Sequence, residues 1–225
     1  MRVYNRLADE AGTLLDDEIA PGSIAERRGQ LDARHVRDLE GWARDLEQRT
    51  GEAIPSFDPR SGGVRATVLV LREEPRCLAD EGSGFVSTDN NNLAAHHTSL
   101  AHSAGGLSYA DTVHWNVVPW WIRNPAFATD RPRTLLNQTR RVLDDLLVLL
   151  DLLRKVKAVL LLGKQAQRAW ATAGLDRYDV IASPHPSPLA WHQSSVSGVR
   201  NSALTISAFA RAAALVRARS DIVEG

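Results

Sequence analysis

The sequence predicts an α/β fold, specifically a three-layer α/β/α sandwich with a central, mainly parallel four-stranded sheet. The first observation is that four short apolar runs have the character of strands buried on both faces. The second is that helical patterns separate the later runs. Strands that alternate with helices in this way form a parallel sheet covered by helices on both faces. The four runs are residues 64–71, 111–118, 156–163 and 178–183.

The N-terminal part of the chain is predicted to be a helical lead-in. Apolar or aromatic residues recur near helical spacing from Ile24 through His35 to Leu46, and Gly51 ends the pattern. A turn-rich stretch, "IPSFDPRSGG", then leads into the first strand. We expect residues 1–225 to form a single domain, with the first 60 residues as its helical lead-in.

The segments between the strands are predicted in turn. After the first strand we expect "REEPR" and then a glycine- and asparagine-rich loop, "DEGSGFVSTDNNN". Helical patterns cover residues 133–155 and 164–174, and a last helix is expected near residues 197–218.

The composition of the chain excludes several classes of protein and of metal site. Lys plus Arg and Asp plus Glu both number 27, so no overall basic excess indicates nucleic acid, although a local basic loop can still contact phosphates. Cys77 is the single cysteine, which excludes an intrachain disulfide and a cysteine-rich zinc or iron–sulfur site. No apolar run approaches the roughly 20 residues of a membrane span. We therefore expect a soluble, cytoplasmic protein without membrane association.

The segments that follow the four strands are where function is expected. Ligands of open α/β sheets bind beyond the carboxyl ends of the strands. All four segments are polar and interrupted by proline or glycine, and this convergence is the strongest functional indication in the residues themselves. The segments are "REEPR", "NVVPWWIRNP", "GKQAQ" and "PHPSPLAWH".

Taken together, these segments resemble the uracil-DNA glycosylase superfamily. "HPSPLA" is close to that family's His-Pro-Ser-Pro-Leu-Ser loop, and "WNVVPW" is similar to the strand whose asparagine recognises the flipped base. "REEPR" stands where the family has its water-activating motif, and "SGFVSTDN" is similar to the segment with the stacking phenylalanine. The resemblance runs from about residue 60 to 215, with the motifs in the family's order.

The resemblance implies a monofunctional DNA glycosylase. Such an enzyme hydrolyses the N-glycosidic bond of a flipped-out pyrimidine and leaves an abasic site in DNA. It implies DNA as the partner and no cofactor. The single cysteine excludes the iron–sulfur cluster that several relatives have, and we expect a monomer. Uracil and a C5-modified pyrimidine are both open as the base. Excision of a modified base would indicate defence against foreign or phage DNA rather than repair.

The resemblance also assigns residues to the base. His185 would donate to the base anion, Asn116 would recognise the base edge, and Phe85 would stack on the base. The prolines around His185 would fix its position. Each residue has an ordinary structural alternative: an exposed turn histidine, an asparagine that caps a loop, and a core phenylalanine.

Three further residues are predicted to contact DNA. Lys164 begins a helix after a glycine, so its ammonium and the helix N-terminus both suit a phosphate. Ser187 would contact a phosphate, and Leu189 would fill the space that the flipped base leaves. A solvated lysine is the alternative for Lys164.

The catalytic carboxylate is open between Glu73 and Glu74. One branch of the family has its acid directly before the proline, which matches Glu74, and other branches have a glutamate one residue earlier, which matches Glu73. We favour Glu73 because the surrounding motifs are closer to those branches. Arg72 stands where relatives have a small residue. Arg76 stands in place of a tyrosine or glycine after the proline, and its guanidinium suits a polar C5 substituent or a phosphate.

Other interpretations are weighed against this one. The spacing of His96, His97 and His102 matches no common zinc pattern, so we expect no metal. A non-catalytic DNA-binding module would keep the pocket without the chemistry. A nucleoside or nucleotide hydrolase would fit the neutral net charge but would leave Leu189 without a role. Three tryptophans either border DNA or complete the core: Trp120, Trp121 and Trp191.

Overall fold

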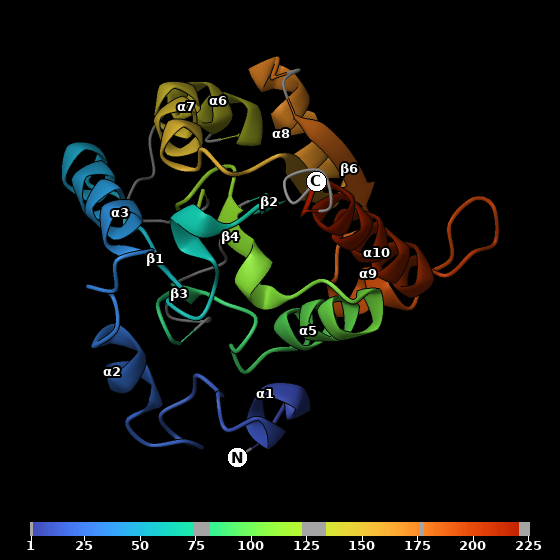
Figure 1. The fold of residues 1–225 in the computed structure, drawn as a ribbon, viewed down its shortest axis with the longest axis horizontal. Coiled ribbons are helices and arrows are strands. Elements are labelled where there is room, and N and C mark those ends of the chain that lie inside the picture. The colour runs from blue at the N-terminus through green and yellow to red at the C-terminus, as the bar shows by residue number, and fades with distance from the viewer. Residues whose placement is uncertain (1, 74–81, 123–133, 176–177, 221–225) are drawn as a thin grey trace.

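The computed structural model describes residues 2–73, 82–122, 134–175 and 178–220. Its central sheet has four parallel strands in the order β4-β2-β5-β6, as Figure 1 shows. This confirms the predicted fold class and all four predicted strands. The strands are β2 (Val68–Arg72), β4 (Thr112–Asn116), β5 (Ala158–Leu162) and β6 (Asp179–Ser183).

The strands β2, β4 and β5 are apolar because helices cover both faces of the sheet there, whereas the outer strand β6 is partly exposed. Successive side chains of a strand point to opposite faces. Leu69 and Leu71 of β2 therefore belong to one buried cluster, while Val68 and Val70 belong to another. All five residues of β5 are buried, which explains why that stretch lacks polar alternation.

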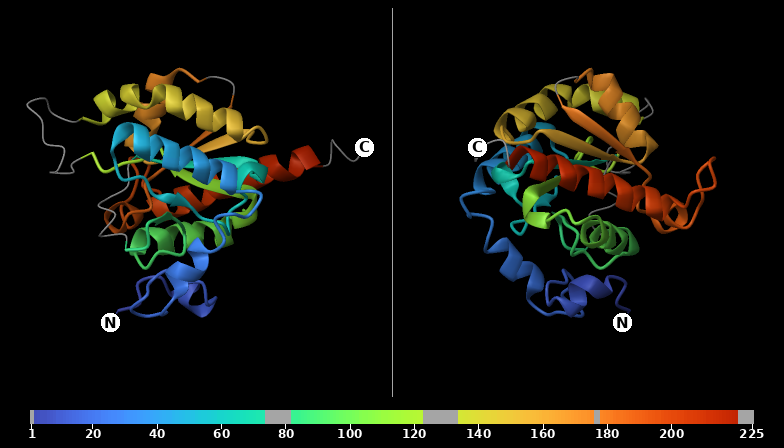
Figure 2. Two further views of the ribbon diagram at one scale, coloured as in Figure 1. Left: turned by 90° about the vertical axis from the view of Figure 1, so that its left-hand side faces the viewer. Right: turned by 45° about the vertical axis from the view of Figure 1, so that its right-hand side comes forward.

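Helices form the two outer layers, which can be followed in Figures 1 and 2. The first layer packs on the face of Leu69 and Leu71 and contains four helices, and the second packs on the face of Val68 and Val70. The first layer is α3 (Arg37–Thr50), α6 (Leu135–Arg141), α7 (Leu143–Leu152) and α8 (Lys164–Ala173). The second is α5 (Leu93–Gly105), α9 (Pro188–Trp191) and α10 (Asn201–Ser220).

The remaining elements are short. A two-stranded parallel sheet joins β1 to β3, and 3-10 turns precede β2 and β4. The helix α1 packs on α5. Within the described ranges, no helix has both the length and the apolar character that crossing a membrane requires. These elements are α1 (Arg6–Glu10), α2 (Ser23–Arg28), β1 (Ser56–Phe57), η1 (Gly63–Arg65), β3 (Phe85–Val86) and η2 (Tyr109–Asp111).

A buried ion-pair network joins the lead-in to the body of the protein. Arg27 of α2 contacts Asp58 at 2.7 Å and Asp89 at 3.0 Å, and all three side chains are almost completely buried. Tyr109 donates to Asp58 at 2.9 Å. Because the charges are paired and hydrogen-bonded, they can be accommodated away from water.

The predicted continuous helical pattern from Ile24 to Leu46 is wrong. The chain forms α2 and α3 instead, and His35 lies between them. The His35 carbonyl accepts from Val64 N at 2.8 Å, and its ring contacts the Pro59 carbonyl at 2.8 Å. These tertiary contacts outweigh the helical periodicity.

Two other helices differ from the sequence-based expectation. The helix α5 directly follows the expected loop, in a stretch for which the sequence predicted no element; the Asn92 side chain caps its start by accepting from Ala95 N at 2.9 Å. Alanine and histidine on several faces hide its periodicity. The pattern expected over 133–155 is two helices, α6 and α7, that meet at Val142.

Candidate active site

Two neighbouring strands bring predicted residues together at the carboxyl end of the sheet. Arg72 and Asn116 are register partners of β2 and β4. The pairing continues past both strands, because Val117 N donates to Arg72 O at 2.8 Å and Val118 N donates to Glu73 O at 3.0 Å. The backbone of Glu73 therefore lies directly beside the segment that follows Asn116.

Asn116 is a buried polar side chain at this edge. It is 3% exposed, and it makes no hydrogen bond to any residue that the structure describes. Its neighbour Trp115 stacks on Phe57 at 3.8 Å on the opposite face, which fixes the strand's orientation. Asn116 thus keeps a donor and an acceptor available for a ligand.

The loop after β6 fixes the orientation of the His185 ring. Ser187 N donates to His185 Nδ1 at 3.0 Å. Because Nδ1 accepts, the neutral ring carries its hydrogen on Nε2. Nε2–H is the donor that the predicted contact with a base anion needs.

Gly163 makes room for His185 between β5 and α8. A Cβ on Gly163 would lie 3.0 Å from the Cβ of His185, and Gly163 has φ +96°. Gly163 N donates to Ser183 O at 2.8 Å, and Gln167 Nε2 donates to the same oxygen at 3.0 Å. The start of α8 is thereby joined to the end of β6, and exposed Lys164 begins α8 beside this junction.

His97 of α5 supports the same loop from the other side. Its Nδ1 donates to the Pro186 carbonyl at 2.8 Å, and its ring stacks on Trp191 at 4.5 Å with an interplanar angle of 7°. Burial lowers the pKa of His97, which favours the neutral ring. His97 is therefore a positioning residue for the loop that carries His185.

His102 lies deeper on α5 and pairs with His114 of β4. Their Nε2 atoms are 3.0 Å apart, and His102 Nδ1 donates to Leu107 O at 2.9 Å. Burial lowers the pKa of His102 to about 4 and the pKa of His114 well below its usual value. Among the described residues, no three His, Cys, Asp or Glu side chains are grouped to hold a metal ion.

Ser187, Leu189 and Phe85 take different positions. Ser187 Oγ accepts from Ala190 N at 3.4 Å and caps α9, while Leu189 of α9 is 76% exposed. Phe85 is 1% exposed in β3, and its carbonyl accepts from Asn90 at 3.0 Å. Leu189 is thus exposed, whereas Phe85 is buried.

Of the two candidate glutamates, the structure describes only Glu73. Glu73 is half-buried directly after β2, and Arg72 donates to Thr98 Oγ1 at 3.4 Å. The predicted residues Glu74 and Arg76 lie outside the described residues. The choice between the two glutamates stays open.

Two of the three tryptophans complete the core. Trp120 is buried, donates to Gln138 at 3.1 Å, and lies under the Arg141 guanidinium at 4.9 Å. Trp191 is buried against His97. The core interpretation therefore holds for both, and Trp121 is half-buried.

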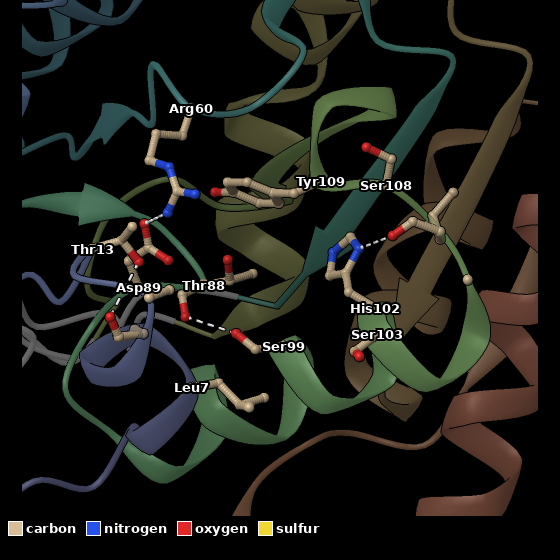
Figure 3. A pocket seen from close by; sticks show the side chains of 14 residues that line it. Leu7, Thr13, Arg60, Thr88, Asp89, Ser99, His102, Ser103, Ser108 and Tyr109 are labelled. Carbon is tan, nitrogen blue, oxygen red and sulfur yellow. Dashed lines mark hydrogen bonds and ion pairs between the residues drawn. The ribbon is translucent and has the colours of Figure 1, made fainter.

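A separate cavity of about 550 Å³ lies at the other end of β4 (Figure 3). Tyr109, which precedes β4, lines it together with Arg60, Asp89 and His102. Arg60 donates to Asp89 at 2.7 Å. None of the residues predicted to act in catalysis, base binding or DNA binding lines this cavity.

A comparison of the sequence with protein-family models identifies the family of the chain. The model of the uracil DNA glycosylase superfamily matches residues 59–212, well over half of the chain. The chain belongs to this superfamily. The match spans all four central strands and the loop that carries His185. No curated protein matches the chain.

For this member of the uracil DNA glycosylase superfamily, sequence reasoning missed two supporting residues. Gly163 was noted only as the residue before Lys164. Its positive φ, which marks it as a position that requires glycine, is not visible in the sequence. His97 was considered only as a metal ligand. A histidine on an unrecognised helix gives no sequence signal for a hydrogen bond to a loop 89 residues away.

Proposed function

We propose that the protein is a monofunctional DNA glycosylase that hydrolyses the N-glycosidic bond of a flipped-out pyrimidine and leaves an abasic site. Superfamily membership supports the reaction class. The observation that carries the proposal is Asn116, a buried amide without a hydrogen bond to the described residues at the carboxyl end of the sheet. Such a group is suited to a base edge that offers complementary donors and acceptors.

The proposed mechanism uses donors aimed at the departing base. Asn116 orients the base, and the Nε2–H of His185 donates to the negative charge that builds on it. Preorganised donors of this kind are worth about 3–4 kcal/mol each in the transition state. Glu73 or Glu74 orients the attacking water and stabilises the positive charge on the sugar.

The partner in this proposal is DNA with one base out of the stack. Unstacking costs a few kcal/mol, and insertion of exposed Leu189 into the space offsets part of that cost. Lys164 and Ser187 contact phosphates, and Phe85 stacks on the face of the base. The chain acts as one domain and as a monomer, and it uses no cofactor and no iron–sulfur cluster.

The base itself is uracil or a C5-modified pyrimidine. An asparagine amide can flip, so Asn116 alone fits uracil or cytosine derivatives. The substitution of arginine at position 76 favours a polar C5 substituent. Excision of such a base is a defence reaction against foreign DNA, and excision of uracil is a repair reaction.

The test is base release from a panel of oligonucleotides containing uracil, thymine, and C5-substituted uracil or cytosine, in single and double strands. We expect release of one class, abolished by Asn116→Ala and by Glu73→Gln or Glu74→Gln. The separate glutamate variants identify the catalytic carboxylate. Bound DNA without release of any base contradicts the proposal and favours a non-catalytic DNA-binding module. Release from free nucleosides alone identifies a nucleoside hydrolase.

A further inference from the structure

Residues 192–200, between α9 and α10, form a closed hairpin whose tip carries Val196. Ser195 N donates to Val199 O at 2.8 Å, and Gly198 N donates to Ser195 O at 2.9 Å. Gly198 has φ +80°, the left-handed conformation that closes a three-residue hairpin loop. The backbone of the tip is therefore held by its own hydrogen bonds.

The base of this hairpin is joined to α9. Ser194 and Arg200 pair as an antiparallel bridge. Asn201 N donates to Gln193 O at 2.9 Å, and Asn201 Nδ2 donates to Ala190 O, within α9, at 2.9 Å. The hairpin is consequently held next to the helix that presents the exposed leucine.

Apolar side chains are concentrated along this short segment and do not pack on the protein. Val196 is 110% exposed, Leu189 76% and Val199 43%. Single exposed apolar residues are ordinary. Here, however, a valine occupies a turn position that polar residues usually fill, on a hairpin that projects beyond α10 (Figure 2, right).

The charge around the hairpin favours a polyanion. The chain has 27 acidic residues, yet none lies between Asp179 and Asp221. The same stretch contains two histidines and four arginines, of which Arg200 lies in the hairpin and Arg211, Arg217 and Arg219 lie farther along the sequence of α10. Arg200, with no acidic residue near it in the sequence, favours contact of the hairpin with the phosphates of a polyanion.

We propose that the hairpin 192–200 is a second DNA-contacting element, and that Val196 packs against the duplex beside the point where Leu189 enters it. The inference rests on the proposed function and adds a preference for double-stranded substrate. A single strand offers no stacked, grooved surface against which the valine can be buried, whereas duplex DNA does. Apolar side chains that enter a groove are a recurrent means of holding distorted DNA.

The test compares Val196→Ser with the parent protein. The probes are a fluorescent duplex that contains one abasic site and the same labelled strand alone, with binding followed by anisotropy. We expect about fivefold weaker duplex binding for Val196→Ser and unchanged single-strand binding, from the loss of one partly buried apolar side chain. Val148→Ser is the matched control, because Val148 of α7 is 50% exposed in the layer opposite α10.

The outcomes separate this inference from the proposed function. Unchanged duplex binding, or an equal loss on both probes, overturns the role of the hairpin, and base release in the oligonucleotide panel is unaffected by that result. Duplex-specific loss without base release from any substrate supports the hairpin and overturns the glycosylase proposal. A parent protein that binds neither probe overturns the hairpin proposal.

Discussion

His97 of α5 donates a hydrogen bond to the Pro186 carbonyl oxygen across 2.8 Å. Through this bond the second helical layer supports the loop that carries His185. The prolines limit the φ angles of the loop, but they do not fix its position on the protein. The histidine contact supplies that second constraint.

Replacing His97 with phenylalanine keeps a ring that can stack on Trp191 but removes the donor to Pro186. We expect base release to fall about tenfold, because a small displacement of a catalytic donor has large effects on rate. The free energy of unfolding should fall by about 1 kcal/mol, the net value of one hydrogen bond. Single-turnover base release and denaturant unfolding measure the two effects. His96→Phe, on the same helix, is the control and should retain activity.

Gly163→Ala tests the close approach to His185. The added Cβ would lie 3.0 Å from the Cβ of His185 at a residue with φ +96°, so we expect both backbone strain and displacement of the His185 loop. Gly174→Ala is the control, because Gly174 has φ +63° and no atom within 4 Å of its Cβ position. Both variants should lose about 1–2 kcal/mol of stability. Only Gly163→Ala should also lose base release; equal rates in the two variants would show that His185 does not depend on this contact.

Asn116→Ala should separate activity from stability. The amide makes no side-chain hydrogen bond to the described residues, so its removal breaks no such bond. We expect base release to fall by about 100-fold or more and the free energy of unfolding to stay within about 1 kcal/mol of the parent value. Base-release kinetics and denaturant unfolding test this. A large loss of stability would mean that Asn116 is a structural residue.

The buried pair His102 and His114 predicts a pH-dependent stability. Their pKa values in the folded protein are lowered by burial, that of His102 to about 4, so the unfolded chain binds protons more readily. The contribution to stability is fully present above the unfolded pKa of about 6.5. It is lost as the pH falls from there toward about 4. His102 alone should reduce the free energy of unfolding by about 2 kcal/mol between about pH 7 and pH 5. Denaturant unfolding across this range measures the slope, which His102→Gln should reduce.

Lys164→Gln should lower the salt dependence of DNA binding. Lys164 follows β5 at the proposed site, and exposed Lys157 precedes β5 at the other end of the sheet. Loss of one phosphate contact should reduce the slope of log affinity against log salt by about 1. Lys157→Gln is the matched control and should leave the slope unchanged. Equal slopes in the two variants would exclude a phosphate contact at Lys164.

The central sheet was predictable from the sequence because β2, β4 and β5 are buried on both faces and so appear as separate apolar runs, whereas the outer strand β6 exposes three of its five residues. The site residues Asn116 and His185 follow from their positions at strand ends. The helix α5 was not predictable in this way, since alanine and histidine obscure its amphipathic pattern. The break between α2 and α3 depends on contacts of His35 with residues far along the chain, and local periodicity contains no information about them.

The contacts that hold the His185 loop in place could not be predicted from the sequence either. Gly163 looks like any glycine before a helix until its neighbour His185 is seen. The hydrogen bond from Ser187 N that sets the His185 tautomer requires coordinates. Sequence reasoning located the candidate site, and the structure adds how the site is held.

The order of the strands has a consequence for partly folded molecules. The strand β6 pairs only with β5 in the central sheet, and the loop with His185 follows it directly. An outer strand is among the elements that detach first when a protein opens locally. A molecule that has lost β6 keeps Asn116 within the remaining sheet but releases its proposed base donor. Local opening at β6 would therefore stop base release while the rest of the sheet stays folded, so that a partly unfolded molecule leaves the base attached to its sugar.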